Sequence, residues 1–198
     1  MRKIHLIKIG IAAVVLTTGF TGFLFTRTPE IQTVAPLKSP ENVPDAKSEV
    51  AGYKNWTKVN DKAEIMESDV AIMCAPATQL GPKNPHKDKF INVYINSIGK
   101  DEMLTKKNPQ FPVGTVVVKE KLSAPDSPTP ELLTVMIKRE KDFNPEVGDW
   151  EFLTFNGDAT EITARGKLES CQACHLGYKQ NDFITRTYLP DEIKQKLK

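Results

Sequence analysis

Five short apolar segments, rich in β-branched residues, most restrict the fold available to this chain. Each has the length of a β-strand, and turn-forming pairs such as Gly81-Pro82, Asn84-Pro85 and Asn144-Pro145 separate them. Successive strands joined by short turns favour antiparallel pairing. The sequence therefore predicts an α+β fold, mainly β, built on an antiparallel sheet. The five segments are residues 70–74, 91–96, 115–122, 132–139 and 150–155.

Few helices are expected beside this sheet. Residues 100–107 follow Gly99 and are long enough for one or two turns. Residues 190–197 begin with Pro190, carry Asp191 and Glu192 early and end in lysines, which is the charge order that a helix dipole favours. A third helix is expected at residues 167–178.

The N-terminus has the pattern of an export signal or a membrane anchor. Basic residues precede residues 9–25, which contain no charge, and Arg27 follows. This run is at the short end of the roughly 17–25 residues that span a bilayer. We expect residues 1–26 to be a signal peptide or a single-pass membrane-targeting helix. The uncleaved anchor is slightly favoured, because no small-x-small cleavage site follows the run closely.

The basic flank keeps the N-terminus in the cytoplasm, so the rest of the chain is expected on the periplasmic side of the bacterial inner membrane, anchored there or soluble. Residues 27–52 are proline-rich and polar, which predicts a linker. Residues 53–198 are then the folded domain. The net charge of +2 gives no indication of nucleic-acid binding.

The strongest chemical signal is Cys171-Gln172-Ala173-Cys174-His175. Two cysteines three residues apart on a helix lie on one face, where their thiols can reach two vinyl groups on one edge of a porphyrin. The next residue supplies an imidazole, a good axial ligand for iron. The motif predicts one covalently attached haem c per chain, on a C-terminal helix, with His175 as the iron ligand.

Three other interpretations of the motif are weaker. A redox dithiol would need a βαβ context, which is absent, and a disulfide between the two cysteines is possible in an oxidising compartment. A zinc site would need more ligands, yet the exported part offers only Cys74 and His86 besides the motif. Cys74 itself, beside apolar neighbours, is interpreted as a core thiol.

A sixth iron ligand is not obvious. His86 lies in a polar loop and is interpreted as a loop histidine rather than a ligand. Met73 and Met136 lie in apolar segments and are assigned to the core, Met66 is a further methionine, and Met103 stays open. The pattern favours five-coordinate iron with an open face for a small ligand, and a six-coordinate electron carrier is the alternative.

Several segments in this order resemble the cytochrome P460 family, which includes the cytochromes c′-beta. The resemblance covers about residues 53–190, and its segments are residues 53–56, 93–96, 111–120, 148–152, 171–175, 182–183 and 186–188. It implies an antiparallel sheet with helices, one c-type haem held through the motif histidine, and a homodimer. Family members of one type carry a lysine bonded to the porphyrin and oxidise hydroxylamine. Members of the other type lack this bond and bind nitric oxide or carbon monoxide.

Lys119 matches the position of the cross-linking lysine of the family. Independently, alternation along 115–122 places Thr115, Val117, Lys119 and Lys121 on one face of the strand and Val116, Val118, Glu120 and Leu122 on the other. Lys119 is therefore a candidate catalytic residue through a haem cross-link, and equally a strand-end lysine that reaches solvent. Lys121 shares its face, so the strand pattern alone does not distinguish the two lysines.

Other candidates are less specific. Phe111, Phe152 and Phe155 are possible aromatic caps of a haem pocket, with core packing the more ordinary role, and Trp56 and Trp150 are assigned to the core. Glu161 and Arg165 are candidates for a polar group at the iron or for solvated charges. The sequence leaves hydroxylamine oxidation and gas binding equally open, and it names no electron-transfer partner.

Overall fold

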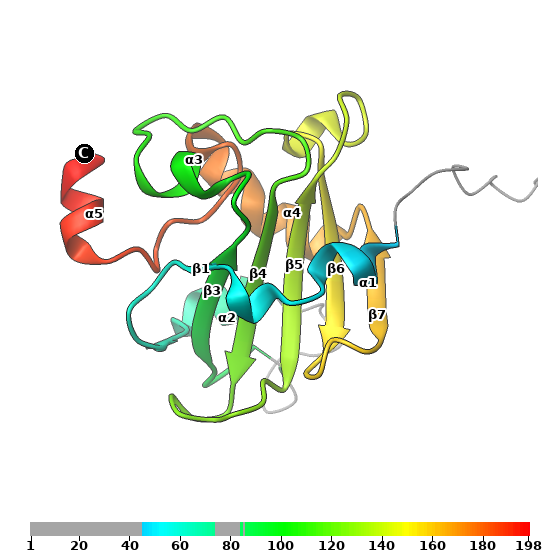
Figure 1. Ribbon diagram of the computed structural model, residues 1–198, viewed down its shortest axis with the longest axis vertical. Helices are drawn as coiled ribbons and strands as arrows, with labels where there is room; N and C mark the ends of the chain where they lie inside the picture. The colour runs from blue at the N-terminus through cyan, green and yellow to red at the C-terminus, as the bar shows by residue number, and fades with distance from the viewer. Residues whose placement is uncertain (1–44, 74–83, 85) are drawn as a thin grey trace, which may run out of the picture. The chain divides into compact units, whose positions relative to one another are not determined.

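An antiparallel seven-stranded sheet dominates the computed structural model, which describes residues 45–73, 84 and 86–198. The strands lie in the order β1-β3-β4-β5-β6-β7, and β2 pairs with β3 (Figure 1). Their bounds are β1 Thr57–Lys58, β2 Glu64–Ile65, β3 Phe90–Ile95, β4 Val116–Leu122, β5 Leu132–Lys138, β6 Trp150–Asn156 and β7 Ile162–Gly166. The predicted mainly antiparallel fold with few helices is confirmed.

Four of the five predicted strand segments are confirmed as β3, β4, β5 and β6. The fifth prediction was wrong: residues 70–73 belong to helix α2 (Ser68–Met73), and Cys74 lies outside the described residues. A short apolar run has no periodicity that separates a buried strand from a buried helix. The start signal that was missed is Ser68-Asp69, a polar and acidic first turn.

The sheet has two covered faces, and Figure 1 shows α1 (Ala46–Val50) crossing one of them and α4 (Glu169–His175) lying behind the other. On the α1 face, Val116, Val118, Val135 and Ile137 form a core with Ala46 and Val50. On the α4 face, a second core contains Val93, Val117, Met136 and Phe152. Because side chains alternate along each strand, neighbouring residues of β4 serve opposite cores. The alternation predicted for residues 115–122 is therefore confirmed.

Helix α1 lies inside the range predicted as a linker. Asp45 caps its N-terminus by accepting a hydrogen bond from the backbone N–H of Lys47, and Ala46 and Val50 are fully buried against the sheet. The domain thus includes residues N-terminal to 53. The remaining predicted boundaries stay predictions, and the predicted leader, residues 1–26, lies outside the described residues.

The other helices are short. They are η1 Tyr53–Asn55, α3 Lys100–Leu104, η4 Pro145–Val147, η5 Leu176–Asn181 and α5 Asp191–Lys196. The helices expected at 100–107, 167–178 and 190–197 correspond to α3, to α4 continued by η5, and to α5. None of the helices in the described part of the chain has the length and apolar character needed to cross a bilayer.

Candidate functional site

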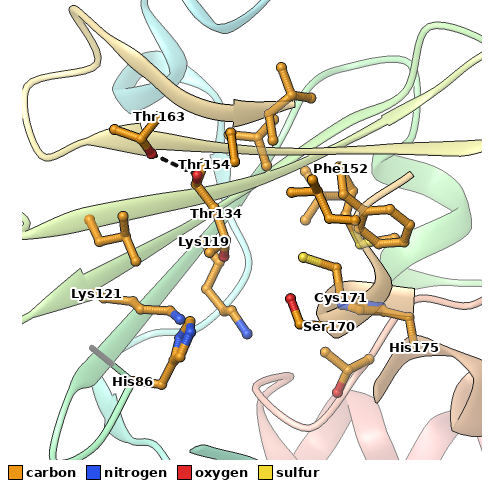
Figure 2. A pocket seen from close by; sticks show the side chains of 18 of the residues that line it. His86, Lys119, Lys121, Thr134, Phe152, Thr154, Thr163, Ser170, Cys171 and His175 are labelled. Carbon is orange, nitrogen blue, oxygen red and sulfur yellow. Dashed lines mark hydrogen bonds between the residues drawn. The ribbon is translucent and has the colours of Figure 1, made fainter. Parts of the chain in front are cut away.

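Helix α4 brings the motif residues to the cavity side of the sheet. It begins after Leu168, carries Glu169 in its first turn and ends at His175. Cys171 and His175 line a cavity of about 890 Å³, and Cys174 lines a side pocket of about 50 Å³ together with His175. Cys171 and His175 therefore lie at one end of the main cavity, and Cys174 lies at the side pocket, which His175 also lines. Figure 2 shows Cys171 and His175 at that end.

The His175 ring has a fixed orientation. Its Nδ1 lies 2.7 Å from the carbonyl oxygen of Phe183, and the ring packs at 5.4 Å from the ring of Phe152. A carbonyl oxygen only accepts hydrogen bonds, so Nδ1 carries the proton and Nε2 keeps its lone pair. A backbone carbonyl in this role is the usual partner of a metal-binding histidine, because it sets the tautomer and the ring orientation.

The imidazole of His175 is neutral at physiological pH. Burial lowers its pKa to about 4, the hydrogen bond to Phe183 acts in the opposite direction, and the positive charge of Lys119 lowers the pKa further. Metal ligation needs the unprotonated nitrogen, so no proton has to be displaced from Nε2 at neutral pH.

A buried ion pair holds the Phe183 carbonyl in place. Asp182 and Phe183 both adopt left-handed backbone conformations, with φ of 50° and 63°. The Asp182 carboxylate accepts hydrogen bonds from Lys138 Nζ at 2.7 and 2.8 Å and from the Phe111 N–H at 2.8 Å. Trp150 Nε1 donates to the Asp182 carbonyl at 2.8 Å. Contacts from three separate parts of the chain thus hold the turn at Asp182 and Phe183 in place. The Phe183 carbonyl in this turn is the group that orients His175.

Gly148 is the residue that lets this turn approach β6. Its φ of 65° favours glycine, and a Cβ there would lie 2.7 Å from Asp182 Oδ1 and 2.7 Å from Phe183 Cδ2. Any larger residue would push the Asp182–Phe183 turn away from the sheet.

The floor of the cavity is the sheet, in three rows set by strand register. The first row contains Val117, Met136 and Phe152, next to His175. The second row contains Lys119, Thr134 and Thr154, and Thr154 shares a 2.7 Å hydrogen bond with Thr163 of β7. The third row contains Lys121 and Leu132. The floor therefore changes from apolar near His175 to basic and hydroxyl-bearing farther along β4 (Figure 2).

The sequence profile of the family named Cytochrome P460 matches residues 50–186, well over half of the chain. The chain belongs to the cytochrome P460 family. No curated protein sequence matches it significantly. Family membership implies a cytochrome with c-type haem, and the Cys171 and Cys174 spacing within a motif that ends in His175 is the attachment pattern of such a haem.

The residues around the cavity fit the haem that the P460 family implies. A volume of about 890 Å³ falls within the range of about 300–1,000 Å³ that is typical of cofactor sites. The site has one neutral imidazole with a free Nε2, an adjacent pair of thiols and largely apolar walls near them. Among the described residues, no cluster of three or more histidine, cysteine or carboxylate side chains forms a competing metal site.

Lys119, the candidate for the cross-link in this P460 protein, lies between the main cavity and the side pocket. It lines both, its Nζ lies 5.9 Å from the centre of the Tyr188 ring, and its charge acts on His175. Its side chain is partly buried. Whether it bonds to the porphyrin stays a prediction.

The structure separates the remaining candidates. Phe152 packs on His175, whereas Phe111 packs on Trp150 in the core and Phe155 lies in the core of the opposite face. Trp150 is fully buried in the core, as predicted, and Trp56 packs against the opposite core. Arg165 pairs with Glu151 on the opposite face, and Glu161 is exposed, so neither lines the main cavity.

Two residues line the main cavity although the sequence did not assign them to the site. Lys121 and His86 are both buried and line the main cavity. Lys121 had a usable signal, since strand alternation already places it on the face of Lys119. His86 had none, because its position depends on Asn84, which accepts a hydrogen bond from the His86 N–H and donates one to the Ala71 carbonyl.

Proposed function

We propose that this protein is an exported, single-haem c-type cytochrome with five-coordinate iron that binds or oxidises a small nitrogen species, nitric oxide or hydroxylamine. One observation carries the proposal. Cys171 and His175 open onto one cavity of cofactor size, and the imidazole there is neutral and oriented by the Phe183 carbonyl. The haem supplies the redox and ligand-binding chemistry, and Cys171, Cys174 and His175 attach and ligate it.

The surroundings of the cavity support an open iron face. Met66 and Met103 are buried in the core and do not line the cavity. The wall next to His175 is apolar, with Val117, Met136 and Phe152, which suits an uncharged ligand such as nitric oxide. We assign the exported part to the periplasmic side of the inner membrane and propose a homodimer, on the strength of the N-terminal sequence and the family resemblance respectively.

The hydroxylamine-oxidising form of the proposal depends on Lys119. Its position inside the site, close enough for its charge to lower the pKa of His175, supports a bond to the porphyrin edge. Mass spectrometry of a haem peptide distinguishes the two forms, because a cross-link joins the peptide of Lys119 to the peptide of Cys171 and Cys174. Lys119→Arg should abolish activity in a cross-linked enzyme and change little in a gas-binding protein.

A six-coordinate electron-transfer cytochrome is the second candidate, because Met136 and His86 line the main cavity. The optical spectrum of the ferrous protein separates the two. A high-spin spectrum supports the open site, whereas a low-spin spectrum that becomes high-spin in Met136→Leu or His86→Leu identifies a sixth ligand and refutes the open site.

The attachment itself is tested by changing both thiols. Cys171→Ala/Cys174→Ala protein, expressed in a host that matures c-type cytochromes, should carry no haem on a denaturing gel, whereas wild-type protein should stain for haem. Haem that stays with the double variant through denaturation would show that another residue forms the bond. Colourless wild-type protein would refute the proposed function altogether.

A further inference from the structure

His86 is a buried polar residue in the wall of the main cavity. Its relative exposure is 7%, and its Nδ1 is buried without a hydrogen-bond partner within the described part of the chain. A buried polar atom that lacks a partner costs stability, and such atoms are rare in native proteins. The imidazole therefore has an unused hydrogen-bonding position that the packing of the fold does not explain.

The backbone of His86 is fixed in place. Its N–H donates to Asn84 Oδ1 at 2.8 Å, and Asn84 Nδ2 donates to the Ala71 carbonyl of α2 at 2.9 Å. Asn84 is itself buried. These bonds hold the residue against the cavity and leave Nδ1 without a partner, which is the arrangement expected of a residue that binds a ligand from a rigid support.

Net charge does not decide what binds next to His86. Lys119 borders Glu64 and Glu67 in the side pocket as well as lining the main cavity. Lys121, which also lines the main cavity, has a partner of its own. The selective feature of this wall is therefore the hydrogen-bonding capacity of His86, which an uncharged ligand can use.

His86 and His175 lie on opposite sides of the main cavity. Both line it, and Figure 2 shows the ring of His86 across the cavity from His175 and Cys171. The two axial positions of a haem iron lie on opposite faces of the porphyrin, so a molecule bound to five-coordinate iron lies on the side away from its histidine ligand. Of the four side-chain atoms buried without a partner in the described part of the chain, only that of His86 lines this cavity.

We propose that His86 hydrogen-bonds, through Nδ1, the small molecule that binds at the open face of the haem. The inference rests on the proposed function and deepens it, because it selects among the possible ligands. The class it selects is a small nitrogen compound that carries a hydroxyl, such as hydroxylamine, over a gas that forms only weak hydrogen bonds, such as carbon monoxide. A site built to hydrogen-bond its ligand discriminates against one that leaves the buried group without a partner.

The test uses full-length, haem-loaded protein and three single variants, His86→Leu, His86→Gln and the control Lys87→Met. Leucine fills most of the space of the imidazole without a polar atom, whereas glutamine keeps a hydrogen-bonding amide. Lys87 directly follows His86 but is exposed, and its Nζ lies 4.0 Å from Asp88. Because Nδ1 has no partner within the described chain, His86→Leu should be at least as stable to denaturant as wild-type protein.

Two titrations followed in the Soret band measure the hydrogen bond. Anaerobic titration of the ferric protein with hydroxylamine should give binding about tenfold weaker in His86→Leu, which is the size expected for the loss of one hydrogen bond. His86→Gln should have an intermediate affinity, and Lys87→Met should bind as wild-type protein does. Carbon monoxide should bind the ferrous forms of all four proteins with equal affinity.

Several results would overturn the role of His86 and leave the proposed cytochrome standing. One is an equal affinity of wild-type protein and His86→Leu for hydroxylamine. Another is an equal loss in His86→Leu and His86→Gln, or an equal loss for hydroxylamine and carbon monoxide, because the size of the side chain rather than its hydrogen bond would then decide binding.

Two further results concern the proposed function as well. A low-spin spectrum that becomes high-spin in His86→Leu would make His86 an iron ligand and refute both the open site and this inference. Colourless wild-type protein would refute haem attachment, and the ligand proposed for His86 would be refuted with it.

Discussion

The two faces of the sheet differ in the charged side chains that they bury and in the partners of those side chains. On the α1 face, Glu151 accepts hydrogen bonds from Arg139 Nε at 2.7 Å and Arg165 Nε at 2.6 Å, and Arg139 also pairs with Glu49 of α1. Glu120 accepts a 2.7 Å hydrogen bond from Tyr53 and a 3.1 Å bond from Asn92, with Lys54 at 3.8 Å. Each buried carboxylate on this face thus has its partners within the chain.

The cavity face has the opposite composition. Basic side chains enter the cavity from β4 and from His86, whereas the buried carboxylate nearest the site, Asp182, is committed to Lys138 and the backbone of Phe111. The difference indicates that the α1 face is closed by contacts within the chain, whereas the cavity face keeps an open cavity of cofactor size. Changes on the α1 face should therefore alter stability, and changes on the cavity face should alter the site.

The largest effect is expected from Glu151→Gln. The Glu151 side chain is 4% exposed and the Arg139 side chain 11%, so removing this charge leaves the poorly solvated Arg139 guanidinium with Glu49 alone as its carboxylate partner. The more exposed Arg165 loses its ion pair as well. Breaking a buried ion pair in this way costs about 3–5 kcal/mol. Denaturant unfolding should show that loss, with the optical spectrum of the folded protein unchanged.

Glu140→Gln is the matched control for that variant. Glu140 directly follows Arg139 but is exposed, so its replacement should change the free energy of unfolding by less than about 1 kcal/mol. A Glu151→Gln protein as stable as the control, or one with an altered spectrum, would contradict the division of roles between the two faces.

The sequence predicted those features of the fold that depend on local periodicity. Alternation along residues 115–122 was enough to place Val116 and Val118 on one face of the strand and Lys119 on the other, because a strand has a fixed two-residue period. The motif gave the site residues on α4 for the same reason, since spacing on a helix is local. The helix at Ser68–Met73 was missed because its apolar run is too short to show a period.

Partners that are distant in sequence could not be predicted. His175 and the Phe183 carbonyl are brought together by a turn whose shape depends on Lys138, 44 residues away from Asp182. The burial of His86 depends on an Asn84 side chain that spans to Ala71. The pairing of Arg165 with Glu151 places Arg165 on the face opposite the cavity, and only the register of β6 and β7 decides that.

A smaller effect is expected from Asp182→Asn, on the cavity face. Asparagine tolerates the left-handed φ of 50° and still accepts from the Phe111 N–H, but it loses the ion pair with Lys138. A hydrogen bond to a charged group contributes about 1.5–3 kcal/mol, so the free energy of unfolding should fall by about 2 kcal/mol. Loss of this ion pair should also let the Phe183 carbonyl move, which weakens its hydrogen bond to His175. The iron–histidine stretching frequency of the ferrous protein should therefore fall.

Asp142→Asn is the control for the backbone effect, because Asp142 is exposed and has a φ of 73°. Its replacement should leave both measurements unchanged. If Asp182→Asn lowers stability but not the iron–histidine frequency, the ion pair supports the fold without orienting His175.

The smallest effect is expected from Tyr53→Phe on the α1 face, and its pH dependence identifies the cause. Burial, the hydrogen bond to Glu120 and the negative charge of Glu120 all raise the pKa of Tyr53 above its ordinary value near 10. Loss of the hydrogen bond should lower the free energy of unfolding at pH 7 by about 1 kcal/mol. Above pH 10 the unfolded chain releases the Tyr53 proton and the folded chain keeps it.

The wild-type protein therefore keeps the Tyr53 contribution fully below pH 10 and loses about 1.4 kcal/mol per pH unit above it, a slope that the phenylalanine variant lacks. The difference between the two proteins should shrink above pH 10 and vanish near pH 11, which denaturant unfolding at a series of pH values measures. Tyr94 is present in both proteins, and burial and Glu120 raise its pKa as well, so its contribution largely cancels in the comparison. Stability curves of the two proteins that stay parallel up to pH 11 would mean that Tyr53 and Glu120 are open to solvent in the folded protein. The contrast between the two faces of the sheet would then be wrong.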